Sequence, residues 1–199
     1  MPILLKNQTS AQLQATLAHA GVSPHLARRL LAASVKRGEL PAPGSDLTTR
    51  LRDDLLALTE IPHLTQVQKV VSPQDGFTKY LFQGRGIGQF EAVRIPLLHR
   101  PDDLKYVACV SSQVGCAMGC VFCATVRMGL GRNLAVWEIV DQVVKMQADS
   151  PHPIRGVVFM GMGEPLLNYD AVMTAIRILS EPCGMAIAAK AITLSTVGI

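Results

Sequence analysis

Charged residues are scarce in this chain of 199 residues. They make up 17% of the sequence, whereas 49% of the residues are hydrophobic, and the mean hydropathy is +0.28. A disordered tail or an array of charged repeats needs the opposite balance, so the composition excludes both classes. Such an apolar composition favours strands that are buried on both faces, as in a parallel sheet, over a sheet with one solvated face.

The sequence also lacks any uninterrupted apolar run near the roughly 18–20 residues that a membrane helix needs. Its first residues, MPILLK, do not show the basic, apolar and small-residue order of a secretory signal. We therefore expect a cytoplasmic protein without a membrane span. The net charge of +4, from 19 Lys and Arg against 15 Asp and Glu, is only weak evidence for a polyanionic partner.

The first sixty residues carry helix signals. With Ser10 as the N-cap, a helix is predicted up to Gly21. A second helix is expected over residues 23–38, where a serine precedes a proline at the first helical position, and a third over residues 48–58. We expect these helices to form a separate domain, residues 1–60, that contacts RNA.

Basic side chains gather on the second predicted helix. This pattern is typical of a solvated helix face above an apolar one. A helix that lies on nucleic-acid phosphates is the alternative interpretation. The basic residues of this helix are Arg28, Arg29, Lys36 and Arg37.

Alternating apolar and polar residues follow the helical region and predict short antiparallel strands. The expected strands cover residues 66–72, 77–83 and 89–95. The glycine-containing segments SPQDG and GRGIG separate them and are typical of hairpin turns. We expect an accessory β segment over residues 61–105.

From residue 106 the pattern changes to strand, helix, strand, helix, strand, which predicts βαβ units with parallel pairing. Three parallel strands leave two open sheet edges. We therefore expect an α/β fold in which residues 106–199 form the first half of a β/α barrel, beside the helical domain and the short β segment. The expected elements are strands 107–111, 156–160 and 191–195 and helices 133–147 and 169–179.

Three of the five cysteines crowd into eight residues: Cys116, Cys120 and Cys123, in the segment CAMGCVFC. In a reducing compartment such a cluster is typical of metal binding or catalysis rather than of a disulfide framework. Three thiolates on one loop after a strand can hold a four-iron cluster with one open iron position. Structural zinc is the alternative, and it needs a fourth ligand from Cys109 or a histidine.

Glu91 lies in the segment QFEAVRIP, on the same strand face as Val93 and Ile95. A carboxylate on such a β-branched face is expected to be desolvated, which would make it a candidate general base. An exposed glutamate on an edge strand is the common alternative.

Several segments together resemble the radical S-adenosylmethionine (SAM) methyltransferases that modify adenine in ribosomal RNA. The segments are CVSSQVGC (109–116), CAMGCVFC (116–123), GLGRNL (129–134), FMGMGEPLLN (159–168) and ITLSTVG (192–198). The resemblance implies methylation of adenine C2 in 23S ribosomal RNA, with some members also acting on transfer RNA, whereas a resistance-conferring branch methylates C8. It extends from about Asp75 to the end of the chain.

The resemblance also implies cofactors and their ligands. A [4Fe-4S] cluster would be held by Cys116, Cys120 and Cys123, and its open iron would chelate SAM. SAM would in addition contact Gly163, Glu164 and Ser195. A reducing electron donor such as flavodoxin would supply the electron.

Two further roles follow from the resemblance. Glu91 would accept the proton of the adenine ring, and Cys109 would form a transient disulfide with a methyl-carrying cysteine to release the product. Cys183 does not match the position of that carrier. We therefore expect a chain truncated after the third barrel strand that does not turn over by itself. A diverged paralogue acting on another RNA and a non-catalytic, metal-stabilised RNA-binding fragment are the alternatives.

Overall fold

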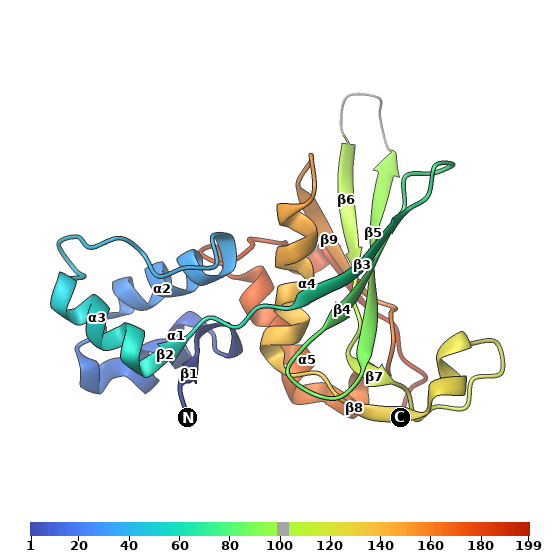
Figure 1. The fold of residues 1–199 in the computed structure, drawn as a ribbon, viewed down its shortest axis with the longest axis horizontal. Helices are drawn as coiled ribbons and strands as arrows, with labels where there is room; N and C mark the ends of the chain where they lie inside the picture. Colours follow the sequence, from blue (N-terminus) through green and yellow to red (C-terminus); the bar gives the residue numbers. More distant parts are fainter. Residues whose placement is uncertain (99–103) are drawn as a thin grey trace.

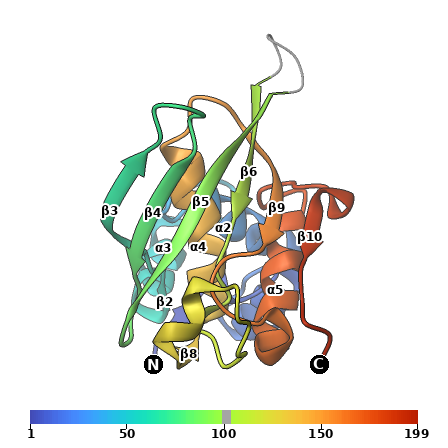
Figure 2. The same cartoon turned by 90° about the vertical axis from the view of Figure 1, so that its right-hand side faces the viewer.

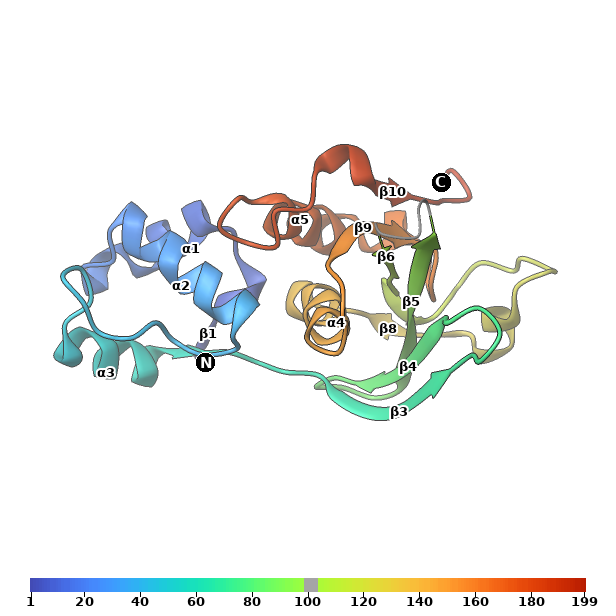
Figure 3. The same cartoon turned by 90° about the horizontal axis from the view of Figure 1, so that it is seen from above.

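The computed structural model describes residues 1–98 and 104–199. It shows an α/β fold with three layers that are seen side by side from above (Figure 3). The N-terminal helices form one outer layer and a twisted sheet forms the other. Two helices, α4 (Val136–Ala148) and α5 (Tyr169–Ser180), lie between them. Among the described residues, no helix is long and apolar enough to cross a membrane.

The three helices predicted in the first sixty residues are present. The first begins one residue earlier than expected, because Thr9 and not Ser10 is the N-cap. The Thr9 hydroxyl accepts a hydrogen bond from the Gln12 backbone N–H, and the Gln12 side chain accepts one from the Thr9 backbone N–H. The helices are α1 (Ser10–Leu17), α2 (Pro24–Lys36) and α3 (Thr49–Leu58), with a 3₁₀ turn at Ala18–Ala20.

A parallel pair of very short strands closes the helical region. Strand β1 (Ile3–Leu4) pairs with β2 (Thr59–Glu60), so the first residues of the chain lie beside residue 60. The 3₁₀ turn Leu5–Asn7 then carries the chain toward α4, where the Asn7 side chain accepts a hydrogen bond of 2.9 Å from the Trp137 backbone N–H. This contact supplies one of the partners that the first turn of a helix lacks.

The sheet has six strands in the order β10-β9-β6-β5-β4-β3 (Figure 1). Strands β10, β9 and β6 are parallel, and β5, β4 and β3 continue the sheet in antiparallel pairing. The expectation of two open edges on the parallel strands is therefore wrong, because β5 covers the outer edge of β6. The strands are β3 (Thr65–Val71), β4 (Thr78–Gln83), β5 (Gln89–Leu98), β6 (Leu104–Cys109), β9 (Ile154–Phe159) and β10 (Ile192–Leu194).

Helices α4 and α5 cover one face of the sheet, and the core lies beneath them. Tyr80 and Phe82 stack at 5.6 Å between ring centroids, and Phe90 packs against Phe82 at 6.4 Å; all three side chains are buried. Aromatic rings bury large apolar areas, so this cluster anchors the antiparallel strands to the helix layer.

A second small sheet, not predicted from the sequence, holds the chain segment that follows β6. Strand β7 (Gln113–Gly115) pairs with β8 (Leu130–Asn133) in antiparallel register. The cysteine-containing segment, residues 116–129, projects from this pair and includes a 3₁₀ turn at Ala124–Met128 (Figure 2). Further 3₁₀ turns lie at Pro165–Asn168 and Ala189–Ala191.

Candidate functional site

The segment that carries the three cysteines is closed at its base by backbone contacts. The Cys116 backbone N–H donates to the Gly129 carbonyl at 2.9 Å. Gly115 has φ +72°, and a Cβ atom at this position would overlap the same carbonyl oxygen. Only glycine fits such a close approach, so the sequence before the first cysteine allows the two ends of the loop to meet.

The thiols of Cys116, Cys120 and Cys123 line one cavity of about 370 Å³. The Thr125 side chain lowers the pKa of the Cys123 thiol by hydrogen bonding to it, and the Thr125 backbone adds to this effect. A thiolate is the form that binds metals, so the shift favours ligation. The other residues that line this cavity include Gly163, Glu164 and Ser195.

The ligand atoms of these cysteines do not converge on a single point. Within residues 1–98 and 104–199, no group of three His, Cys, Asp or Glu side chains is arranged to hold one metal ion. A single zinc ion requires such convergence. Thiolates of an iron–sulfur cluster bind different iron atoms and surround a larger body. Cys116, Cys120 and Cys123 line one cavity and can supply three thiolates of that kind.

Glu164 lies directly after Gly163 at the carboxyl end of β9 and is 3% exposed. Its carboxylate accepts hydrogen bonds from the Thr196 hydroxyl at 2.6 Å and from the Val197 backbone N–H at 3.0 Å. The backbone N–H of Leu166 adds a third at 3.0 Å. Burial by itself would raise the pKa of this carboxyl, but the three hydrogen bonds together hold it below its usual value. Glu164 is therefore an anion at neutral pH.

Ser195 and Thr196 follow β10 and meet the same cavity. The Ser195 backbone N–H contacts the Phe159 carbonyl at 3.4 Å and continues the pairing of β10 with β9. The side chain that contacts Glu164 belongs to Thr196, which the sequence reasoning missed. The only sequence signal was the position of Thr196 next to Ser195, because the contact joins residues that are 32 positions apart.

Glu91 is not desolvated, which corrects the expectation from its strand pattern. Its side chain is 46% exposed and lies 3.1 Å from the Lys79 ammonium. The buried face of β5 carries Ala92 and Arg94 instead. Arg94 is accommodated there because its guanidinium donates to the Asp149 carbonyl at 2.8 Å and to the Thr78 hydroxyl at 3.0 Å. The apolar residues Phe90 and Ala92 share this face, and the hydrogen bonds allow the Arg94 cation to be buried beside them.

Glu91 nevertheless lies beside the cysteine cavity. It lines a neighbouring cavity of about 640 Å³ whose wall includes Met128 and Met162. Thr125 lines both cavities. The Glu91 backbone N–H contacts the Met162 sulfur at 3.4 Å. This contact joins the start of β5 to the turn that follows β9.

Cys109 ends β6 and lies opposite Val93 of β5 and Val158 of β9. Directly opposed residues share a sheet face, so Cys109 shares the face of Val93 and Glu91. Burial raises the pKa of the Cys109 thiol, and a hydrogen bond from the Met160 backbone partly opposes that shift. All five cysteines, including Cys183, are free thiols in this structure.

Comparison with known proteins finds a shared domain and similar chains. The Radical SAM superfamily matches residues 110–199. A protein of Myxococcus xanthus named Probable RNA methyltransferase is 46% identical over 98% of this chain and 54% of its own length. The Dual-specificity RNA methyltransferase RlmN of Syntrophobacter fumaroxidans is 43% identical over the whole chain and 57% of its own length. Residues 110–199 thus form a radical SAM domain, and the chain as a whole is similar to proteins named as RNA methyltransferases.

A solved radical SAM relative agrees with this assignment. The crystal structure of a radical SAM methyltransferase from Sphaerobacter thermophilus superimposes with a TM-score of 0.82 and 37% sequence identity. The alignment covers all of this chain and 58% of that protein. The chain thus spans little more than half the length of the radical SAM proteins that it matches.

A radical SAM domain implies a [4Fe-4S] cluster and SAM. The residues present fit both groups, because three thiols surround a cavity and a buried carboxylate that is held ionised lines its wall. A carboxylate of this kind can accept hydrogen bonds from the ammonium of an amino acid. The roles of the individual residues stay predictions.

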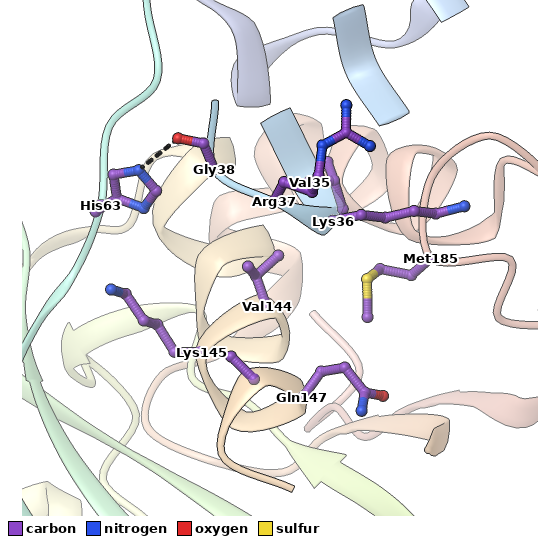
Figure 4. Close-up of a pocket in the computed structure, with 10 residues that line it drawn as sticks. Val35, Lys36, Arg37, Gly38, His63, Val144, Lys145, Gln147 and Met185 are labelled. Carbon is purple, nitrogen blue, oxygen red and sulfur yellow. Dashed lines mark hydrogen bonds between the residues drawn. The ribbon is translucent and has the colours of Figure 1, made fainter. Parts of the chain in front are cut away.

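A separate cavity lies at the C-terminal end of α4 (Figure 4). It has a volume of about 390 Å³ and is bounded by the end of α2, by α4 and by Met185. Its polar edge includes Lys145 and His63, and the His63 ring lies 3.3 Å from the Gly38 carbonyl. Within the described chain, no cysteine lines this cavity.

The basic helix α2 is partly neutralised by acidic neighbours. Arg29 forms an ion pair with Asp46, and Arg37 lies 3.3 Å from Glu39. The helix therefore offers less positive charge to a phosphate backbone than its four basic residues would by themselves.

Proposed function

We propose that this protein methylates an adenine carbon, C2 or C8, in RNA by radical SAM chemistry. The substrate that we expect is 23S ribosomal RNA, with transfer RNA as a second one. The observation that carries the proposal is the shared cavity of Cys116, Cys120, Cys123, Gly163, Glu164 and Ser195, which adjoins the cavity of Glu91. When bound, the cluster and SAM would supply a carbon-centred radical, which can react with an electron-poor ring carbon.

The residues of the cavity would bind and orient these groups. Cys116, Cys120 and Cys123 would ligate three irons and leave one iron position open for SAM. Glu164 would accept hydrogen bonds from the amino group of SAM, since its carboxylate is anionic and retains free lone pairs beside Thr196. The backbone at Gly163 and the Ser195 side chain would complete this contact.

Glu91 and Cys109 would act on the substrate side. Glu91 would take the ring proton, and its exposure on the wall of a 640 Å³ cavity leaves the carboxylate open to a base that has left its stack. Cys109 is a neutral thiol in the free chain because burial raises its pKa. It would lose its proton and attack the sulfur of the carrier cysteine, so that the disulfide forms as the bond between that sulfur and the transferred carbon breaks; the electron pair of that bond would stay on the carbon, which takes up a proton to become the methyl group. Both residues share the sheet face away from α4 and α5.

The rest of the chain would support this reaction. Strands β6, β9 and β10 would be the first three strands of a β/α barrel, with active-site loops after their carboxyl ends. Residues 1–60 would contact the RNA, and residues 61–105 would extend the sheet beside Glu91. A reduced donor such as flavodoxin would supply the electron in the cytoplasm.

The test is anaerobic reconstitution of the chain with iron and sulfide, followed by incubation with a reductant, SAM and unmodified 23S ribosomal RNA. Nucleosides from the digested RNA are then separated and analysed by mass spectrometry. From residues 1–199 alone we expect 5′-deoxyadenosine without methylated adenosine, because none of their cysteines matches the methyl carrier. With a protein that also supplies the carrier cysteine, we expect 2-methyladenosine or 8-methyladenosine as well. The same reaction with Glu91→Gln, which keeps the side-chain size, should retain 5′-deoxyadenosine and lose methylated adenosine.

Two outcomes would contradict the proposal. Stoichiometric zinc in place of iron would favour a metal-stabilised RNA-binding fragment. With the carrier cysteine supplied, formation of 5′-deoxyadenosine with every tested ribosomal and transfer RNA left unmethylated would favour a diverged paralogue that acts on another RNA.

A further inference from the structure

Gln113 connects the base of the cysteine loop to the turn that carries Glu164. Its side chain is fully buried. The amide oxygen accepts the Glu164 backbone N–H at 2.9 Å, and the amide nitrogen donates to the Asn133 side chain at 2.7 Å. These two bonds fix the orientation of the buried amide. If the amide were turned over, its nitrogen would face the donor of Glu164 and its oxygen would face the acceptor of Asn133.

The glycine before Glu164 packs directly on this side chain. Gly163 has φ +103°, and a Cβ atom there would lie 2.6 Å from Cβ and 2.7 Å from Cγ of Gln113. The missing Cβ therefore allows the turn to approach the amide closely enough for the hydrogen bond to form. The backbone N–H of Gln113 also contacts the Met162 carbonyl at 3.2 Å, so the turn is held on two sides.

The other end of the connection lies where β7 pairs with β8 at the base of the cysteine loop, and we call this pair the loop neck. Gln113 and Asn133 face each other in the pairing of β7 with β8, three residues before Cys116 and four after Gly129. The Asn133 amide nitrogen donates in turn to the Leu167 carbonyl at 3.1 Å. The contacts thus run from the loop neck through two amides to both ends of the segment around Glu164.

We propose that Gln113 is a positioning residue that fixes Glu164 relative to the three cysteines. The cluster on the three cysteines and the carboxylate of Glu164 would hold one SAM molecule from two sides. The affinity for SAM therefore depends on the distance and orientation between the cysteine loop and the turn that carries Glu164. No other side chain in the described residues bonds both the Glu164 backbone and the loop neck. The inference rests on the cofactor arrangement of the proposed function, but not on the identity of the RNA.

The experiment compares cofactor binding at equal cluster content. The chain and the variant Gln113→Met are reconstituted anaerobically, and iron and sulfide are counted per chain. SAM is then titrated while the electron paramagnetic resonance spectrum of the reduced cluster is recorded. We expect normal iron content, since the backbone closure at Cys116 and Gly129 stays, and at least tenfold weaker SAM binding.

A rescue variant separates positioning from packing. Gln113→Glu keeps an acceptor for the Glu164 N–H and loses the donor to Asn133. We expect its SAM affinity to lie between those of the native chain and Gln113→Met. The control Gln147→Met removes a side-chain bond to the Ile154 N–H at the far end of α4 and should bind SAM normally.

Native SAM affinity in Gln113→Met at equal iron content would overturn the inference. If that variant does not fold or load iron, Asn133→Ala decides, because it keeps Gln113 and removes the partner that orients its amide, together with the bond from Asn133 to the Leu167 carbonyl. We expect about threefold to tenfold weaker SAM binding in it, and native affinity would again contradict the proposal. SAM binding that follows these expectations, without any RNA methylation by a protein that also supplies the carrier cysteine, would leave the inference standing and overturn the proposed function alone.

Discussion

The ammonium of Lys6 lies 2.5 Å from a carboxylate oxygen of Asp141, and both side chains are fully buried. Lys6 also donates to the Pro62 carbonyl at 3.1 Å, and the Leu64 backbone N–H donates to Asp141 at 2.7 Å. Burial lowers the pKa of Lys6, although Asp141 opposes this shift. The pair joins the start of the chain to α4, the helix that follows the cysteine loop.

Removal of one partner of this pair should strongly destabilise the fold. We expect Lys6→Met to lower the free energy of unfolding by about 3–5 kcal/mol, because Asp141 stays buried without its counter-ion. Urea unfolding followed by circular dichroism measures this. The half-exposed pair of Lys69 and Asp149 provides the control, and Lys69→Met should cost no more than about 1 kcal/mol. Equal losses in the two variants would show that burial does not matter here.

The three loop cysteines should each be needed for iron. We expect Cys116→Ala, Cys120→Ala or Cys123→Ala to lose the brown colour and most of the iron after reconstitution, since two thiolates leave the cluster without a ligand set. Iron and sulfide analysis measures this. Cys183→Ala should keep its iron, because Cys183 contacts Glu181 and does not line the cysteine cavity. Full iron content in a loop variant would contradict the assignment.

Gly163 should not tolerate a side chain. We expect Gly163→Ala to lower the free energy of unfolding by about 1–3 kcal/mol, because its φ of +103° is strained for alanine and its Cβ would overlap Gln113. Gly119 lies in the cysteine loop, and a Cβ atom added there would have no neighbour within 4 Å. Gly119→Ala should therefore stay within about 0.5 kcal/mol of the native chain. Thermal and urea unfolding compare the two.

Glu164 should make a pH-dependent contribution to stability. Its pKa is lower in the folded chain than the ordinary value of 4.5, so the stabilisation is fully present above pH 4.5. It is lost as the pH falls from there through the lowered pKa. We expect the difference in unfolding free energy between the native chain and Glu164→Gln to be constant near pH 7 and to shrink in acid. Urea titrations over this range measure it, and a constant difference throughout would contradict the prediction.

Local sequence signals predicted much of the fold. The proline at the start of α2, the glycine after it and the strand alternation around the glycine turns all act within a few residues, and the corresponding elements are present. The one-residue error at the Thr9 cap arose because both Thr9 and Ser10 can cap a helix and only the Gln12 contact distinguishes them. Strands β7 and β8 were missed because three or four residues carry too little pattern.

The sequence by itself determined the spacing of Cys116, Cys120 and Cys123, the glycine before Glu164 and the order of helices and strands, since these depend on neighbours along the chain. Only the tertiary structure decided which face of β5 is buried, because the partners of Arg94 come from β4 and from the end of α4. It also decided that Thr196 and Gln113 contact the Glu164 segment. Those hydrogen bonds join residues that are 32 and 51 positions apart. They can form only after the sheet has brought the ends of its strands together.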